Sequence, residues 1–113
     1  MADDCLFCRI VRREIPATLV FEDDDVVAFR DINPQAPTHI VIVPREHVAS
    51  LNDVDDAAQI GRLSLAAARL ARSEGIAESG YRTVVNTNRD AGQTVFHVHL
   101  HLIGGRRMAW PPG

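Results

Sequence analysis

The sequence has no excess of positive charge, and this excludes one large class of partner. Its 113 residues include 12 Lys and Arg against 15 Asp and Glu, which gives a formal net charge of -3. Proteins that bind nucleic acid by neutralising many backbone phosphates need the opposite balance. We therefore expect any phosphate that this protein handles to belong to a small molecule, and we expect no nucleic-acid partner.

Long apolar runs and a secretory start are also lacking. The first residues, Met-Ala-Asp-Asp-Cys, have neither the basic charge nor the apolar stretch of a signal peptide, and no run is long enough to cross a bilayer. The sequence thus predicts a cytoplasmic protein with no membrane partner. Its two cysteines, Cys5 and Cys8, form a C-x-x-C pair. In a reducing compartment such a pair indicates metal binding or redox chemistry more than a structural disulfide.

The bulk composition is typical of a globular protein. Hydrophobic residues make up 46% of the chain and charged residues 24%, and no internal repeat or linker is visible. A length of 113 residues suits one hydrophobic core. The prediction is a single domain that spans residues 1–113.

Apolar spacing and turn residues predict the order of the elements. A short helix is expected over 5–13, capped by Asp3 or Asp4 and ended by Pro16. The expected strands are 19–22, 26–30, 39–44, 81–86 and 95–103, and one long amphipathic helix is expected over 55–73. This inventory favours an α+β domain with an antiparallel sheet.

Three of the five histidines alternate within the last expected strand, as His97, His99 and His101. Residues two apart in a strand share a face, so the three imidazoles are expected on one side. Neighbouring imidazoles repel when they are charged, which indicates a role in metal binding or proton transfer. Either the three rings chelate one metal, or the middle ring attacks an electrophile while a neighbour donates a proton. The spacing alone does not distinguish between these two chemistries.

The segments that flank this strand favour the second chemistry. Gly92-Gln93-Thr94 comes before it and Gly104-Gly105-Arg106 after it. A flexible backbone, an amide and a hydroxyl suit a phosphoryl group, which needs hydrogen-bond donors around its oxygens. A phosphate site beside a histidine nucleophile is the better interpretation.

The motif His97-Val-His-Leu-His-Leu102 resembles the signature of the histidine-triad (HIT) family of nucleotide hydrolases and transferases. Further blocks resemble the Hint branch of that family across nearly the whole chain: Asp31-Ile-Asn-Pro-Gln-Ala-Pro-Thr-His39, Pro44-Arg-Glu-His47 and Trp110-Pro-Pro-Gly113. The resemblance implies a HIT-like fold, with a five-stranded antiparallel sheet, two helices, and a homodimer through which the sheet continues. It implies hydrolysis of purine nucleoside phosphoramidates, and of aminoacyl-adenylate-like compounds, to the nucleoside monophosphate.

The resemblance also assigns roles to individual residues. His99 is the expected nucleophile, which forms a covalent nucleotidyl-histidine, His101 contacts the phosphate, and His39 completes the imidazole cluster. Asp31 is expected to accept hydrogen bonds from the sugar hydroxyls. Trp110 lies in a tail that reaches the partner subunit's site. The expected phosphate contacts are Asn86, Gln93 and Thr94, and the expected purine slot is formed by Phe7, Ile10, Phe29 and Ile32.

A second set of residues predicts a structural zinc. Cys5 and Cys8 with two free histidines would make an ordinary Cys2His2 ligand set. Some bacterial HIT proteins that keep the C-x-x-C pair bind zinc through both thiolates, the histidine of the Pro-x-x-His turn and the first histidine of the triad. By that resemblance the ligands are Cys5, Cys8, His47 and His97. The alternatives are small buried cysteines with a surface histidine, or a redox pair.

Two other functions stay open at this point. Other HIT branches run the same covalent step as dinucleoside polyphosphate hydrolases or nucleotidyl transferases, although Gly104-Gly105-Arg106 and the Trp-Pro-Pro-Gly ending favour the Hint branch. A nucleotide-binding regulatory module with little turnover is the other alternative. No organic cofactor is expected.

Overall fold

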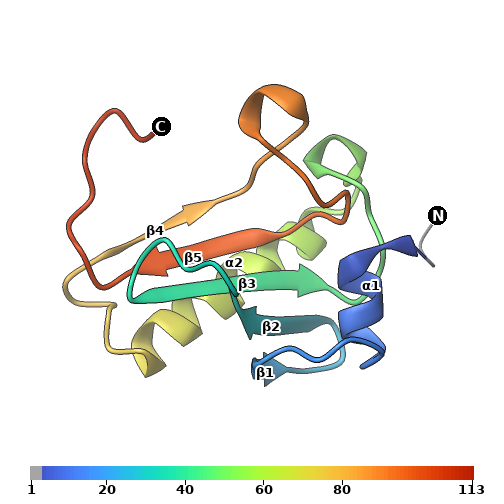
Figure 1. The fold of residues 1–113 in the computed structure, drawn as a ribbon, viewed down its shortest axis with the longest axis horizontal. Coiled ribbons are helices and arrows are strands. Elements are labelled where there is room, and N and C mark those ends of the chain that lie inside the picture. Colours follow the sequence, from blue (N-terminus) through green and yellow to red (C-terminus); the bar gives the residue numbers. More distant parts are fainter. Residues whose placement is uncertain (1–3) are drawn as a thin grey trace.

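The two expected strands 19–22 and 26–30 form a hairpin at one edge of the sheet in the computed structural model, which describes residues 4–113 (Figure 1). Strand β1 is Leu19–Glu22 and strand β2 is Val26–Arg30, as expected. The side chain of Asp23 accepts hydrogen bonds from the main-chain N–H groups of Asp25 and Val26, each at 2.8 Å. Such a side-chain bond stabilises a tight turn without help from the rest of the chain.

The remaining strands complete an antiparallel sheet of five strands in the order β1-β2-β3-β5-β4. Strand β3 is Thr38–Pro44, β4 is Tyr81–Val84 and β5 is Leu100–Gly104. All seven residues of β3 are buried, as is typical of a central strand that is covered on both faces. Because β3 and β5 are neighbours, residues 58 to 66 positions apart in the sequence lie side by side.

The long helix α2, Ala57–Ser73, packs across one face of the sheet (Figure 1). It begins at its N-cap residue Asp56, whose side chain accepts from the N–H of Ala58, and this start lies within two residues of the prediction. Leu63 is fully buried in the core that the helix shares with Leu100 and Leu102. In the described part of the chain, neither helix has the length and apolar content that crossing a bilayer requires.

The short helix α1, Leu6–Val11, covers the opposite face, because its buried residues belong to a different core cluster from those of α2. Phe7 and Ile10 pack against Phe29 and Val41 in a second apolar cluster. The helix is shorter than the predicted 5–13, and its cap is Cys5, whose sulfur accepts from the N–H of Cys8. The prediction of an Asp4 cap is wrong, because the side chain of Cys5 caps the helix instead. The alternative cap, Asp3, lies outside the described residues.

Two predicted strands are shorter than expected at the end near the histidines. Strand β4 ends at Val84 and β5 begins only at Leu100, so His97 and His99 precede the strand. The N–H of Val98 donates to the carbonyl of Val48 at 2.6 Å and not to a neighbouring strand. A contact with the turn after β3 therefore ends the sheet pairing there.

Candidate active site

The pairing of β3 with β5 brings His39 and His101 together. His39 lies opposite Ile103, and His101 lies opposite Val41, so the two histidines are diagonal neighbours on one face of the sheet. Nε2 of His39 is 2.8 Å from Nδ1 of His101. One of these nitrogens must donate to the other, which links the two imidazoles into one hydrogen-bonded pair.

His99 adjoins this pair from the segment just before β5. Its ring centroid is 5.0 Å from that of His101, and the ring of Phe7 meets it edge-on at 4.9 Å. Nδ1 of His99 donates to the carbonyl oxygen of His97 at 2.7 Å. Since a neutral imidazole carries one proton, Nε2 of His99 keeps a free lone pair, as a nucleophile requires.

His97 lies on the same side of the sheet but has different partners. Phe7 contacts the rings of both His97 and His99, which places both on the side covered by α1. The ring of His97 is fully buried and packs against His47, with centroids 5.0 Å apart. The three imidazoles share a side, as expected, yet the ring of His97 packs with His47 whereas the ring of His99 packs with His101.

Burial keeps the imidazoles of this region uncharged. Desolvation, together with the neighbouring His99 and His39, lowers the pKa of His101 to about 4, although the Asp31 carboxylate opposes the shift. It also lowers the pKa of His99 and of His39, although the Asp31 carboxylate opposes the shift at both. These rings are therefore neutral at pH 7, so His99 can attack and the repulsion expected within the cluster is avoided.

A cavity of about 460 Å³ opens in front of His99 and His101. Asp31 lies at its rim, where its Oδ1 accepts from the N–H of Asn33, and Ile32 is almost entirely exposed. His39 does not line the cavity and stands behind His101. The expected substrate-binding residues that do line it are Phe7, Ile10, Phe29, Asp31, Ile32, Asn86 and Thr94.

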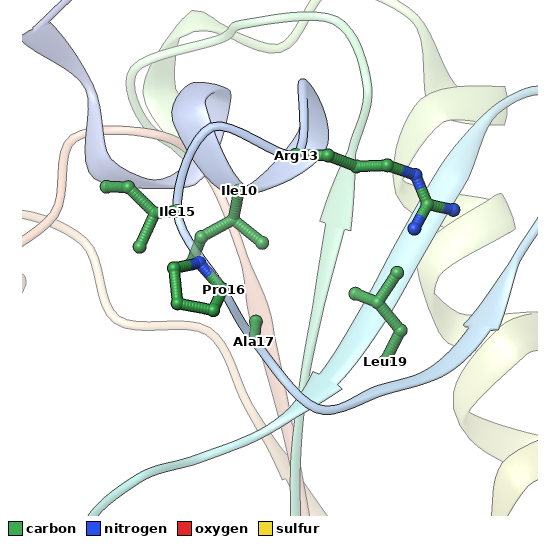
Figure 2. Close-up of a pocket in the computed structure, with 6 residues that line it drawn as sticks. All are labelled: Ile10, Arg13, Ile15, Pro16, Ala17 and Leu19. Carbon is green, nitrogen blue, oxygen red and sulfur yellow. The ribbon is translucent and has the colours of Figure 1, made fainter.

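The apolar end of this cavity includes a segment that the sequence analysis did not single out. Ile15, Pro16 and Ala17 connect α1 to β1 and line the cavity beside Ile10. The same four residues, with Arg13 and Leu19, line a neighbouring hollow of about 310 Å³ (Figure 2). The connection is thus a thin wall between the two hollows. In the sequence, the only signal for this segment is Pro16, which ends the first helix. Other lining residues, such as Val41 and Val95, were not predicted because their sequence pattern is that of ordinary core residues.

Two expected substrate contacts are not brought to the cavity. The amide of Gln93 is buried and bonds to the protein itself, since it accepts from the N–H of Asn88 at 2.9 Å and donates to the carbonyls of Ala49 and Val95. Gln93 therefore shapes the loop before His97. Trp110 is 81% exposed in the C-terminal tail and does not line the cavity of its own chain.

The other expected phosphate segment also has a different place. Arg106 follows β5, but its Nε donates to the carbonyl oxygen of Gln35 at 2.9 Å, and the residue does not line the cavity. The expectation that Gly104-Gly105-Arg106 surrounds the phosphoryl group is therefore not met by this side chain. Arg106 instead holds the loop that carries Asp31 and Ile32.

The four expected metal ligands converge at the N-terminus of α1. Nδ1 of His97 is 3.4 Å from the sulfurs of Cys5 and Cys8 and 3.2 Å from Nδ1 of His47. All four donor atoms lie within 4.8 Å of one another. A tetrahedral zinc with bonds of about 2.0–2.3 Å needs ligand atoms roughly 3.3–3.8 Å apart, so the set fits a zinc ion. Pro44 also accepts the Nε2–H of His97 at 2.8 Å, which leaves Nδ1 as the free ligand atom.

Comparisons with known proteins agree with this geometry. The family model of the HIT domain matches residues 12–108. The purine nucleoside phosphoramidase of Escherichia coli K12 is 53% identical over 108 residues, which cover 94% of this chain and 91% of that protein. An uncharacterised HIT-like protein of Synechococcus elongatus is 50% identical over the full length of both chains. The crystal structure of a HIT family hydrolase from Legionella pneumophila superposes with a TM-score of 0.95, at 54% identity, and covers 97% of this chain and 100% of that one.

Proposed function

This chain belongs to the HIT domain family, and from that membership we propose that it hydrolyses purine nucleoside phosphoramidates to the nucleoside monophosphate through a covalent intermediate on His99. The E. coli relative that is 53% identical is a purine nucleoside phosphoramidase. The observation that carries the proposal is the hydrogen bond from Nδ1 of His99 to the carbonyl of His97, because it leaves Nε2 unprotonated at the wall of the cavity.

The reaction has two displacement steps at phosphorus. Nε2 of His99 attacks the phosphorus and forms a P–N bond while the bond to the leaving nitrogen breaks, and that nitrogen takes up a proton as it departs. His101 lies beside His99, and its N–H can donate a hydrogen bond to the reacting phosphoryl group, while the proton for the leaving nitrogen comes from the solvent. Water then attacks the phosphorus and gives up a proton to the solvent while the P–N bond to His99 breaks, which releases the monophosphate and returns His99 to its neutral form.

The remaining cavity residues bind the substrate. Asp31 accepts hydrogen bonds from the ribose hydroxyls, and Asn86 and Thr94 donate to the phosphoryl oxygens. Preorganised donors of this kind stabilise the charge that develops in the transition state. The purine lies in the slot formed by Phe7, Ile10, Phe29 and Ile32, which line the cavity together. Aminoacyl-adenylate-like compounds carry the same nucleoside and phosphoryl groups, so they belong to the same substrate class.

The activity test compares the wild type with His99→Ala on adenosine and guanosine 5'-phosphoramidates. The wild type should release the monophosphate, and the variant should be slower by roughly 10³-fold or more. A wild-type rate no higher than that of the variant would refute the proposal and leave a nucleotide-binding module. Faster turnover of a dinucleoside polyphosphate than of the phosphoramidate would indicate the activity of another HIT branch.

The second part of the proposal is a structural zinc held by Cys5, Cys8, His47 and His97. Their spacing suits tetrahedral ligation, and burial lowers the pKa of His97 to about 4, so this ring is neutral as a ligand must be. Zinc there would supply a crosslink between α1 and the segment before β5. Elemental analysis of protein purified without added metal should give about one zinc per chain, and a ratio near zero with both thiols reactive would refute it.

We further propose that residues 1–113 form one HIT domain that pairs into a homodimer with a continuous sheet. Strand β4 is at the edge of the sheet, and Tyr81 on it is 40% exposed. An exposed edge strand is a template for pairing with another chain. In the dimer the exposed Trp110 would reach the partner's cavity. Sedimentation should give twice the mass of the chain, and a monomer at micromolar concentration would contradict the proposal.

The location and partners complete the proposal. A cytoplasmic location, where thiols stay reduced, suits Cys5 and Cys8, because the proposed zinc site needs both as thiolates. The net charge of -3 argues against nucleic acid as a partner, and we propose a small purine nucleotide as the substrate and no membrane partner. Cell fractionation with an antibody to the chain tests the location.

A further inference from the structure

The loop that precedes β3 is tied to His39 by its main chain. The N–H of Gln35 donates to Nδ1 of His39 at 3.0 Å. A main-chain N–H can only donate, so Nδ1 of His39 must be the acceptor and carry no proton. The neutral ring of His39 therefore bears its proton on Nε2.

The surroundings of Nε2 require the same arrangement. Nε2 of His39 is 2.8 Å from Nδ1 of His101 and 3.4 Å from a carboxylate oxygen of Asp31. Both of these atoms can accept a hydrogen bond from Nε2–H. The reverse arrangement would put a proton on Nδ1 of His39 against the N–H of Gln35. A buried donor left without an acceptor costs roughly 1–3 kcal/mol, which is enough to select one tautomer.

The consequence is passed on to His101. Since Nε2–H of His39 donates to it, Nδ1 of His101 is an acceptor, and its own proton must lie on Nε2. That nitrogen has no protein partner among residues 4–113, and the ring of His101 lines the cavity. His101 thus presents an N–H, and not a lone pair, to whatever occupies the cavity.

The loop itself is held in place from its other side. Nε of Arg106 donates to the carbonyl oxygen of Gln35 at 2.9 Å. This approach depends on Gly105, because a Cβ there would lie 3.0 Å from Cβ of Pro37, and its φ of +90° is one that side-chain-bearing residues rarely adopt. The neighbouring Arg107 is also exposed, and its side chain makes no hydrogen bond or ion pair in the described part of the chain.

We propose that Arg106 and the main-chain amide of Gln35 are positioning groups, which act through His39 to hold the proton of His101 on Nε2, facing the substrate. The order of contacts is Arg106 to the Gln35 carbonyl, the Gln35 amide to His39, and His39 to His101. The inference rests on the proposed function only in assuming that a substrate binds in the cavity beside His101. The tautomers themselves are a property of the free protein.

The direct test is a long-range ¹H–¹⁵N correlation spectrum of the histidine rings in ¹⁵N-labelled protein at pH 7. The spectrum distinguishes a protonated from an unprotonated ring nitrogen, and the His39→Gln and His101→Gln variants assign the signals. His39 and His101 should both be neutral with the proton on Nε2. A proton on Nδ1 of either ring would overturn the proposal, whether or not the protein hydrolyses phosphoramidates.

Two pairs of variants test the positioning groups. Gln35→Pro removes the amide hydrogen and should give mixed tautomers at His39 and His101, whereas Gln35→Ala keeps the hydrogen and should leave the spectrum unchanged. Arg106→Met should lower kcat about three- to tenfold, as the loss of one hydrogen bond would, with KM within about twofold. Arg107→Met should change neither, and Arg106→Lys, which keeps a cationic donor, should recover part of kcat.

The outcomes separate the two proposals. Unchanged tautomers in Gln35→Pro, or an unchanged kcat and spectrum in Arg106→Met, would overturn the positioning role. An inactive wild type with the expected tautomers would refute the phosphoramidase and leave the hydrogen-bond chain intact.

Discussion

The carbonyl oxygen of His97 accepts the Nδ1–H of His99 at 2.7 Å. The same residue turns its own Nδ1 toward Cys5, Cys8 and His47. The proposed metal site and the proposed nucleophile are therefore joined by one main-chain carbonyl. A change that moves the ring of His97 should also move the acceptor that orients His99.

Removing the metal should destabilise the fold. If zinc crosslinks α1 to the segment before β5, its binding free energy adds to the stability, and a strong chelator should lower Tm by more than about 5 °C. Differential scanning fluorimetry measures this. The Cys5→Ser/Cys8→Ser double variant should start at the lower Tm and be insensitive to the chelator, and equal sensitivity of both proteins would contradict the proposed ligands.

The hydroxyl of Thr94 should matter more than its size. Thr94 lines the cavity, and Thr94→Val keeps the shape while it removes a donor to the phosphoryl oxygens. We expect a loss in kcat of roughly 100-fold, the usual effect of deleting one preorganised donor. Thr94→Ser keeps the hydroxyl and should retain most of the activity. Equal rates for the Val and Ser variants in a phosphoramidate assay would exclude the contact.

Acid should destabilise the protein through His101. Burial lowers its pKa from 6.5 to about 4, so between these values the unfolded chain binds the proton and the folded chain does not. Stability is therefore full above about pH 6.5 and falls with decreasing pH, by roughly 3 kcal/mol by about pH 4 from this one group. His97, with a pKa of about 4, adds a loss in the same window.

Urea denaturation at several pH values isolates the part due to His101. The His101→Gln variant lacks the titrating group, so its stability should decline less steeply than that of the wild type between about pH 6.5 and pH 4. Parallel pH profiles for the two proteins would contradict the lowered pKa.

Leucines on opposite sides of α2 should differ in their effect on stability. Leu63 is fully buried against the sheet, and Leu63→Ala should cost roughly 2–5 kcal/mol through lost burial and the cavity it leaves. Leu65 is 60% exposed, and Leu65→Ala should cost less than about 1 kcal/mol. Chemical denaturation of both variants measures the difference. Similar losses in the free energy of unfolding would contradict the assignment of Leu63 to the buried face of α2 and of Leu65 to its exposed face.

Two glycine substitutions should have opposite signs. A Cβ at Gly104 would lie 2.5 Å from Cδ1 of Ile76 and 3.3 Å from Cβ of Tyr81, so Gly104→Ala should destabilise by about 1–3 kcal/mol. A Cβ at Gly61 on α2 meets nothing within 4 Å, and Gly61→Ala should stabilise the helix by up to about 1 kcal/mol.

A second change tests the cause of the Gly104 effect. Ile76→Val removes Cδ1, the atom that comes closest. In the background of Gly104→Ala it should therefore cost less than it does in the wild type, and a double-mutant cycle measures the coupling. Simple additivity would mean that the clash lies elsewhere.

The sequence by itself determined the elements and the chemistry they carry. Alternating and helical spacings, with the break at Pro16, predict all five strands and both helices, because these signals act between residues that are close in the sequence. The histidine motif and the blocks around it were enough to indicate the HIT family and a phosphoryl substrate. Strand ends near His97 were predicted less well, since the contact of Val98 with Val48 that ends the pairing is long-range.

Tertiary structure alone decided which atoms of these residues are available. The proton positions of His97, His99 and His39 are set by the Pro44 carbonyl, the His97 carbonyl and the Gln35 amide, and main-chain groups of this kind leave no trace in residue type. In the folded chain the amide of Gln93 also bonds to the carbonyl of Ala49, and Arg106 bonds to the carbonyl of Gln35 in the loop before β3. A sequence pattern specifies which side chains exist and which face they share, but a hydrogen bond depends on distance and direction, which only the folded chain supplies.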